Sequence, residues 1–291
     1  MTQFSQRRWK LCVGLALAGC LAGLGVFWTV GSYLCAPNNH PVRVPENLPV
    51  EAVSFPSASG ATLRGWLVSP APARGVVILQ HGVHSTRASM VGRARFLSAA
   101  GYAVLLFDFQ AHGESVGQRI TFGHLESRDS QAAVAFVKQR FPRQPVALIG
   151  VSLGGAAALL AEPPLDVQAL VLESVFPTIV DATKDRLEWL FTRPARCLSP
   201  LLTCQFKLRM GISPDALRPI DHAARLKTPK LFLAGTADPR TRFSEAQQMF
   251  TLAAEPKSFF PVPGADHEDL HRYLGARYEQ LILEFLAARL K

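Results

Sequence analysis

Three polar residues, Ser152, Asp238 and His267, occur in this order along the chain, and each closely follows an apolar segment. A serine hydroxyl becomes a nucleophile when a histidine accepts its proton, and that histidine needs a carboxylate to orient its ring. The three residue types, in this order, predict hydrolysis through a covalent acyl-enzyme. Ser152 is the expected nucleophile, His267 the base and Asp238 the orienting acid.

The strongest local signal surrounds Ser152, which lies between Gly150 and Gly154 in the sequence Gly-Val-Ser-Leu-Gly. A predicted strand, 146–151, ends just before this serine, and a predicted helix begins at residue 153. Gly-x-Ser-x-Gly at a strand-to-helix turn is the nucleophile elbow, in which small flanking residues prevent steric clashes. The N-terminus of the helix also favours negative charge that develops nearby.

Two other carboxylates compete with Asp238 for the role of the orienting acid. Glu173 lies in the predicted strand 169–174 and is the best alternative. Asp266 is adjacent to His267, which makes the required geometry awkward. Asp238 stands at the place that the order serine, acid, histidine requires. It is therefore preferred, and Glu173 remains open.

A tetrahedral intermediate needs two hydrogen-bond donors for its oxyanion, usually backbone N–H groups. We expect one donor from Leu153, directly after the nucleophile. The other is expected from Val83, in the loop that follows the predicted strand 75–81. His81 suits the same loop, and Gly82 would allow the backbone to approach closely.

The elements that must position these residues alternate between short apolar strands and amphipathic helices from residue 51 to residue 291. This alternation predicts an α/β fold with a mostly parallel sheet covered by helices on both faces. Ligands bind such sheets at the carboxyl ends of the strands. The predicted strands are 51–55, 61–68, 75–81, 102–108, 146–151, 169–174, 230–235 and 257–262. The predicted helices lie near 88–100, 126–140, 243–254 and 270–290, with a further helix from 153.

Residues 175–225 interrupt this alternation with many apolar side chains and no clear strand. Because the segment lies between two predicted strands, we interpret it as a small helical cap over the site rather than as an irregular layer of the core. Cys197 and Cys204 also lie here, and two buried thiols are favoured over a disulfide, which stays open. Residues expected to line an apolar pocket include Trp189, Phe191 and Phe206.

The N-terminal region, residues 1–35, is predicted to be a membrane anchor. Residues 11–35 contain no charged side chain, and this length exceeds the roughly 20 residues that span a bilayer. A cleaved signal peptide has a shorter apolar segment of about 7–15 residues. Residues 36–50 carry four prolines without periodicity, which predicts a linker to a domain at 51–291.

The basic residues around this segment predict its orientation. Arg7, Arg8 and Lys10 precede the apolar run, whereas Arg43 is the first basic residue after it. This asymmetry predicts a cytoplasmic N-terminus and an extracytoplasmic domain, periplasmic in a Gram-negative bacterium. One alternative stays open: Leu-Ala-Gly-Cys ending at Cys20 resembles a lipobox, although the apolar run continues well beyond it.

Composition limits the classes of partner. With 48% hydrophobic and 18% charged residues, the chain has ample material for a large core and is not a disordered protein. The net charge of +9 favours an anionic lipid surface, because the arginines are scattered without the basic runs typical of nucleic-acid binding. No spacing typical of metal ligands occurs, so we expect no cofactor. The oligomeric state stays open.

Taken together, these motifs resemble the α/β-hydrolase superfamily over about residues 50–291. The most similar branch is that of the serine aminopeptidase (S33), monoacylglycerol-lipase-like and BEM46-like hydrolases. The matching positions, besides Asp238 and His267, are His81-Gly82, Asp108 to Ser115, Gly123, Glu126, Asp129, and Gly150 to Gly155. Two departures occur: Ala111 replaces the glycine before His112, and no HGGG run follows His81. The resemblance implies serine hydrolysis on an α/β-hydrolase fold.

The function predicted from the sequence is that of a membrane-anchored serine hydrolase that cleaves carboxylic (acyl) esters. An apolar cap beside a membrane anchor favours a small acyl ester over a peptide as substrate. Because this fold hosts many activities, three alternatives remain: a serine aminopeptidase or amidase, a thioesterase, and a non-catalytic binding protein that keeps the pocket. The natural acyl chain is not predicted.

Overall fold

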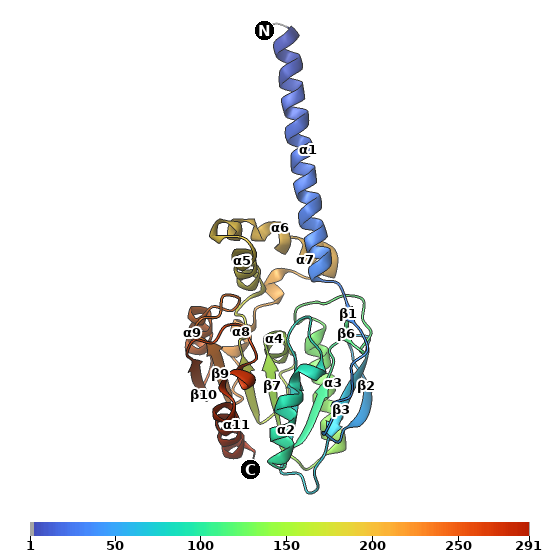
Figure 1. Cartoon of the computed structure of the whole chain (residues 1–291), viewed down its shortest axis with the longest axis vertical. Coiled ribbons are helices and arrows are strands. Elements are labelled where there is room, and N and C mark those ends of the chain that lie inside the picture. Colours follow the sequence, from blue (N-terminus) through green and yellow to red (C-terminus); the bar gives the residue numbers. More distant parts are fainter. Residues whose placement is uncertain (1–2, 291) are drawn as a thin grey trace.

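An eight-stranded sheet forms the centre of the α/β domain in the computed structural model, which describes residues 3–290 (Figure 1). The strand order is β10-β9-β8-β7-β4-β5-β3-β2, and β3 pairs antiparallel with both β2 and β5 while the other pairs are parallel. The strands are β2 (Glu51–Pro56), β3 (Thr62–Val68), β4 (Val76–Gln80), β5 (Ala103–Phe107), β7 (Val146–Val151), β8 (Ala169–Glu173), β9 (Lys230–Gly235) and β10 (Lys257–Val262). The predicted fold class is confirmed, and every predicted strand is present within one residue at each end.

Helices cover both faces of the sheet, because apolar residues alternate between the faces along each strand. In β7, Leu148 packs into the core cluster that includes residues of α3 and α4, whereas Ile149 packs into the cluster that includes residues of α2 and α11. The helices on the first face are α3 (Glu126–Arg140), α4 (Leu153–Leu159), α8 (Pro219–Ala223) and α9 (Phe243–Leu252). Those on the second face are α2 (Val91–Ala99), α10 (Leu270–Leu274) and α11 (Ala276–Arg289).

Two predicted helices differ in detail from the structure. The helix expected near 88–100 begins with a 3-10 turn, η1 (Arg87–Met90), before α2. The helix expected at 270–290 is divided into α10 and α11 at Gly275, where φ is 55°. Glycine adopts this backbone region at little cost, so the division falls where the chain can turn most easily.

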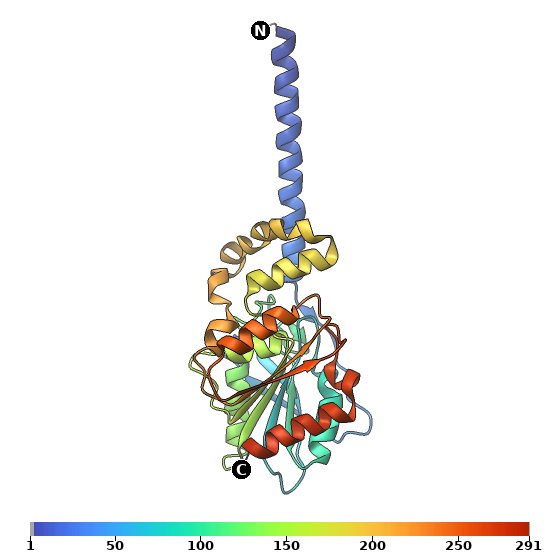
Figure 2. The same ribbon diagram turned by 90° about the vertical axis from the view of Figure 1, so that its left-hand side faces the viewer.

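The segment between β8 and β9 forms a group of short helices above the carboxyl ends of the strands (Figure 2). Its helices are α5 (Ile179–Leu190), η2 (Arg193–Leu198), α6 (Ser199–Thr203), α7 (Gln205–Met210) and η3 (Pro214–Ala216), followed by α8. Ile220 and Ala223 of α8 belong to the main core cluster. The region predicted as a cap, 175–225, therefore contributes both a lid and, at its end, part of the core.

A long helix, α1 (Gln3–Leu34), projects away from the domain next to these short helices (Figure 1). The predicted linker 36–50 is held against the core: β1 (Asn38–Asn39) pairs in parallel with β6 (His112–Gly113), and the Ile120 N–H donates to the Cys35 carbonyl at 2.9 Å. The end of α1 is thus fixed to the domain. Residues 1, 2 and 291, which begin the predicted anchor and end the predicted domain, lie outside the described residues.

Candidate active site

Ser152 occupies a sharp turn between β7 and α4, with φ 50° and ψ −110°. Its N–H donates to the Glu173 carbonyl at 2.8 Å, which ties the turn to β8. A Cβ on Gly150 would lie 2.5 Å from a backbone nitrogen of α4, and a Cβ on Gly154 would lie 2.5 Å from the Gln80 carbonyl oxygen. Only glycine fits at these two positions, and their close packing holds the serine in a backbone region that is strained for an L-residue.

Asp238 and His267 lie together in the loops that follow β9 and β10. Asp238 Oδ2 is 2.7 Å from His267 Nδ1, while Oδ1 accepts the backbone N–H groups of Arg240 at 2.8 Å and Thr241 at 2.9 Å. The Asp238 side chain is fully buried, and that of His267 is 17% exposed. The three hydrogen bonds fix the carboxylate, which in turn orients the imidazole ring.

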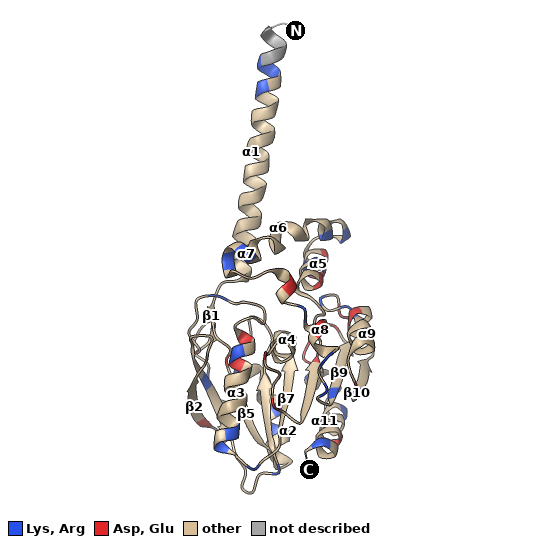
Figure 3. Cartoon of the chain, turned by 180° about the vertical axis from the view of Figure 1, so that it is seen from behind, with Lys and Arg blue, Asp and Glu red and all other residues tan. Residues whose placement is uncertain are grey.

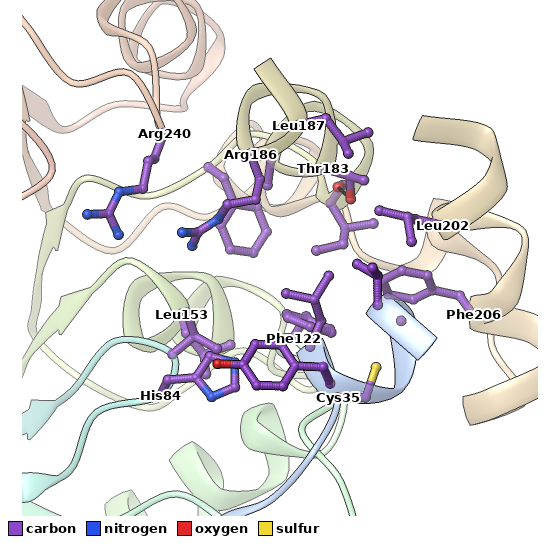
Figure 4. A pocket seen from close by; sticks show the side chains of 18 of the residues that line it. Cys35, His84, Phe122, Leu153, Thr183, Arg186, Leu187, Leu202, Phe206 and Arg240 are labelled. Atoms are coloured by element: carbon purple, nitrogen blue, oxygen red, sulfur yellow. Dashed lines mark hydrogen bonds between the residues drawn. The ribbon is translucent and has the colours of Figure 1, made fainter. Parts of the chain in front are cut away.

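Ser152 and His267 both line one cavity of about 340 Å³, together with Val83 and Leu153 (Figure 4). The structure therefore places the predicted nucleophile, the predicted base and both predicted oxyanion donors at the same cavity. Asp238 lies behind His267. All of these residues follow the carboxyl ends of strands, as expected for a mostly parallel sheet.

The backbone N–H groups of Val83 and Leu153 donate no hydrogen bond to any residue of the described chain, 3–290. Buried or half-buried donors without a protein acceptor are available to a ligand. His81 holds the loop that carries Val83: the Phe109 N–H donates to its Nε2 at 3.1 Å, and its Nδ1 is 2.7 Å from the Gly82 carbonyl. Burial, aided by nearby His112, lowers the pKa of His81 to about 3, so its ring is neutral.

The competing carboxylates have other partners. The Glu173 side chain is buried, binds Arg93 with a 2.6 Å contact between Oε2 and Nη2, and accepts the hydroxyl of Tyr278. The Asp266 carboxylate accepts the backbone N–H of His267. Within residues 3–290, neither carboxylate forms a hydrogen bond with the imidazole ring of that histidine.

Most of the remaining wall of the cavity is apolar, and much of it comes from two regions distant in sequence, the cap and the end of α1. Phe191 and Phe206 line it as expected, but Trp189 does not: this ring is 47% exposed and stacks with Arg186 and Arg240. The prediction for Trp189 is wrong because its ring packs on the guanidinium groups of Arg186 and Arg240, and these two arginines line the cavity instead. The lining residues from the end of α1 are Val30, Gly31, Tyr33, Leu34 and Cys35.

The end of α1 is packed tightly against α7. Gln205 Nε2 donates to the Phe27 carbonyl at 3.1 Å, and the Arg209 guanidinium donates to the Trp28 carbonyl and lies 3.9 Å from the centre of its ring. A Cβ on Gly31 would lie 2.3 Å from Gln205 Oε1. The apolar helix is thus part of the cavity wall, a role that no local sequence pattern predicted.

Other residues of the region have structural or minor roles. Thr241, which sequence analysis did not identify, donates from Oγ1 to the Ser174 carbonyl at 3.2 Å and lies 3.4 Å from His267 Nδ1. Cys197 and Cys204 are free and exposed, so the expectation of buried thiols is wrong: Cys197 lies in η2 and Cys204 at the junction between α6 and α7, and both side chains reach the surface of the cap. No cluster of three or more metal-ligating side chains occurs in the part of the chain that the structure describes.

Comparison with known proteins places the chain among hydrolases. The model of the serine aminopeptidase S33 family matches residues 71–217. Protein YqkD of Bacillus subtilis is 23% identical over 245 residues, which cover 83% of this chain and 80% of YqkD. The lysophosphatidylserine lipase ABHD12 of Macaca fascicularis is 26% identical over 263 residues, covering 81% of this chain and 62% of that protein. A solved esterase from Pyrococcus furiosus superposes with a TM-score of 0.72 at 22% identity, over 89% of this chain and 98% of that one, which confirms the α/β-hydrolase fold.

Proposed function

Because the chain belongs to the serine aminopeptidase S33 family of α/β-hydrolases, we propose that it is a serine hydrolase that cleaves acyl esters at a membrane. One observation carries this proposal. Ser152 on its strained turn, His267 and two N–H groups without protein acceptors all face one largely apolar cavity. Such an arrangement serves nucleophilic attack on a carbonyl carbon.

In the proposed reaction, Ser152 Oγ attacks the ester carbonyl carbon while His267 Nε2 takes the hydroxyl proton. Asp238, hydrogen-bonded to Nδ1, stabilises the imidazolium that forms. The oxyanion accepts the N–H groups of Val83 and Leu153. The imidazolium then gives its proton to the departing alcohol oxygen, which leaves an acyl-enzyme. Water, deprotonated by the same imidazole, attacks the acyl carbon; the bond to Ser152 Oγ then breaks, the imidazolium returns its proton to this oxygen, and the carboxylic acid is released.

The lining of the cavity supports esters over aminopeptidase substrates. An aminopeptidase must hold a charged α-amino group, which needs carboxylates. Among the described residues that line the cavity there is no Asp or Glu, whereas Arg186, Arg209 and Arg240 are present. A cationic substrate group would meet like charges there, which is unfavourable. The lipase name of ABHD12 and the esterase name of the Pyrococcus protein agree with this preference.

We further propose that residues 1–35 anchor a hydrolase domain of residues 51–291 in a membrane, with 36–50 as the connection and a cap within 175–225. The candidate membrane span of α1, Arg7–Leu34, contains 28 residues, or about 42 Å at 1.5 Å per residue, whereas the hydrocarbon core is about 30 Å thick. The uncharged length of the helix is visible in Figure 3. The excess length allows the last turns to leave the hydrocarbon and contact the cap.

The composition of the cap surface supports the same arrangement. The cap, whose helix α6 contacts α1, carries exposed large apolar side chains: Trp189, Leu190, Phe191, Leu198 and Leu208. Exposed apolar side chains of this size favour contact with lipid or another apolar surface. With the cap resting on lipid, an acyl chain could pass from the membrane to the cavity without crossing water.

A substrate screen on the full-length protein in detergent micelles tests the activity. We expect hydrolysis of acyl esters and covalent labelling by a fluorophosphonate probe, both of which depend on Ser152. A screen in which aminoacyl amides are turned over faster than every ester would contradict the proposal and favour the aminopeptidase alternative.

Fractionation tests the anchor and its orientation. We expect the full-length protein to resist extraction by salt and alkali, and its domain to be digested by protease added to spheroplasts. Cys20→Ser distinguishes the anchor from a lipoprotein, since an uncleaved anchor keeps its mass and location. A wild-type chain that begins at Cys20 with attached lipid would contradict the transmembrane anchor.

A further inference from the structure

Two arginines face the cavity next to the residues proposed for catalysis. Arg186 comes from α5 of the cap, and Arg240 lies two residues after Asp238 in the loop that follows β9. Both line the cavity that also contains Ser152 and His267. In Figure 4 both arginine side chains lie above Leu153, with the guanidinium group of Arg240 toward the left edge of the view, apart from that of Arg186.

Arg186 and Arg240 differ from nearby arginines in that they form no ion pairs with the described part of the chain. Arg196 and Arg242, at the same junction of cap and core, each form ion pairs with Asp185 and Glu188. In contrast, neither of the two cavity arginines forms an ion pair with any residue of the described chain. The local carboxylates are thus used to join the cap to the core, and the two guanidinium groups at the cavity are left without a counter-ion.

The contacts that the two arginines do make leave hydrogen-bonding capacity unused. Their guanidinium carbons lie 5.5 Å (Arg186) and 4.6 Å (Arg240) from the centre of the Trp189 ring, which positions both groups. The Nε of Arg240 is buried and has no hydrogen-bond partner. Stacking satisfies no N–H donor, so a purely structural role leaves the buried Nε donor of Arg240 unexplained.

Two neighbouring cations in a largely apolar cavity are unfavourable unless an anion joins them. Burial and then the charge of Arg240 lower the pKa of Arg186, and Asp238 only partly opposes them. Asp238 already accepts three hydrogen bonds and is not free to act as the counter-ion. Guanidinium groups match phosphate oxygens with paired N–H donors, and the match is strongest away from bulk water.

The position of the pair indicates which part of a substrate it would bind. His267 must lie on the side of the leaving alcohol, since it protonates that oxygen. Arg240 belongs to the same loop as Asp238, which lies directly behind this histidine. The apolar wall from α1 and the cap provides room for the acyl chain. An anion held by the two arginines would therefore be carried by the alcohol.

We propose that Arg186 and Arg240 form an anion subsite that selects esters whose alcohol carries a phosphate group. The proposal rests on the ester hydrolysis proposed above and adds the class of alcohol. The two arginines are specificity-determining residues: they bind the substrate but take no part in proton transfer.

The test compares two substrates with the same acyl chain, 1-oleoyl-glycerol and 1-oleoyl-glycerol 3-phosphate, in micelles of an uncharged detergent. The full-length wild type is measured beside Arg186→Gln, Arg240→Gln and the double variant. We expect kcat/KM for the phosphate ester to fall about 10-fold in each single variant and further in the double variant, as for loss of a charge-assisted hydrogen bond. For the neutral ester, the change should stay below about 3-fold.

Two controls isolate the subsite. Arg193→Gln removes an exposed cation of the cap that does not line the cavity, so it should leave the substrate preference unchanged. Arg240→Lys keeps the positive charge but lacks the paired N–H donors of the planar guanidinium, and should retain only part of the preference for the phosphate ester. Inorganic phosphate identifies the source of the anion: inhibition of the wild type but not of the double variant assigns free phosphate as a ligand. If inorganic phosphate does not inhibit the wild type but the preference for the phosphate ester is retained, the subsite binds phosphate only as part of the ester.

An unchanged ratio of the two kcat/KM values in the double variant would overturn the subsite, as would an equal loss in Arg193→Gln. The proposed function fails separately. If neither ester is hydrolysed and Ser152 is not labelled by a fluorophosphonate, the hydrolase itself is contradicted. If the neutral ester is cleaved through Ser152 without preference for phosphate, only the subsite is wrong.

Discussion

The two sides of the cavity are built differently. On the side of the sheet, Ser152, Asp238 and His267 follow strand ends and are held by short loops and backbone hydrogen bonds. On the opposite side, α1 and the cap meet through side chains, and Gln205 bonds a carbonyl 178 residues away in sequence. The first side has one geometry set by the core, whereas the second depends on contacts between separate elements. We infer that chemistry belongs to the rigid side and selection of the acyl chain to the adaptable one.

The largest effect is expected on the side of the sheet. Ser152→Ala should abolish fluorophosphonate labelling and lower ester kcat by at least about 10³-fold, and His267→Ala should cost a similar factor because nucleophile and base act as a unit. Hydrolysis rates and probe labelling measure this effect, with thermal unfolding as a control for folding. Robust turnover by Ser152→Ala would contradict the mechanism.

The same division explains what could be predicted from the sequence. The strand ends depend on short, nearly continuous apolar runs, and the turn at Ser152 depends on its flanking glycines. Both patterns are visible in the sequence. The break at Gly275 could have been suspected from the glycine itself. The catalytic roles of Ser152, Asp238 and His267 stay predictions, although the structure brings the three together.

The cap and α1 could not be predicted in the same way. Sequence analysis placed Trp189 in the pocket and buried Cys197, both wrongly, since short helices with apolar residues on several faces do not reveal which face is covered. It also predicted only a membrane anchor for α1, whereas in the structure the end of this helix lines the cavity. The docking of Gly31 against Gln205 is a tertiary contact between distant segments, which no local pattern encodes.

A medium effect is expected where α1 meets the cap. Gly31→Val must displace the Gln205 side chain, because the added Cβ would lie 2.3 Å from its Oε1. Loss of the wall should lower kcat/KM for long-chain acyl esters by roughly 10-fold, as for the loss of one or two buried contacts. A short acetyl ester, which does not reach this wall, should be affected less than about 2-fold.

Gly25→Val is the matched control on the same helix, because a Cβ at this position meets no atom within 4 Å. It should behave as the wild type towards both esters. Equal losses in the two variants, or a loss that does not depend on acyl length, would show that the end of α1 serves attachment alone. The inference that α1 and the cap select the acyl chain would then be wrong.

The smallest effect is expected at the junction between the cap and α9. Glu245 of α9 is surrounded by Asp185 and Asp181 from α5 and by Arg242; burial and then the Asp185 carboxylate raise its pKa to about 8. The folded protein therefore keeps a proton that the unfolded chain loses near pH 4.5. The contribution of this protonated contact to stability is complete below pH 4.5 and is lost as the pH rises to about 8.

Glu245→Gln keeps a neutral hydrogen-bond donor at this junction but cannot ionise. Between pH 5 and pH 8 the melting temperature of the variant in detergent should fall about 2–4 °C less than that of the wild type, a shift expected for a modest change in stability in a chain of this size. Glu284→Gln, at an exposed position on α11, should keep the wild-type pH dependence. If the cap is the adaptable side, the ratio of kcat/KM for a long-chain ester to that for the acetyl ester should fall in the wild type over the same pH range, and it should stay constant in Glu245→Gln. A parallel pH dependence in Glu245→Gln and wild type would mean that this carboxyl does not control the junction, and the cap would then be as rigid as the sheet beneath it.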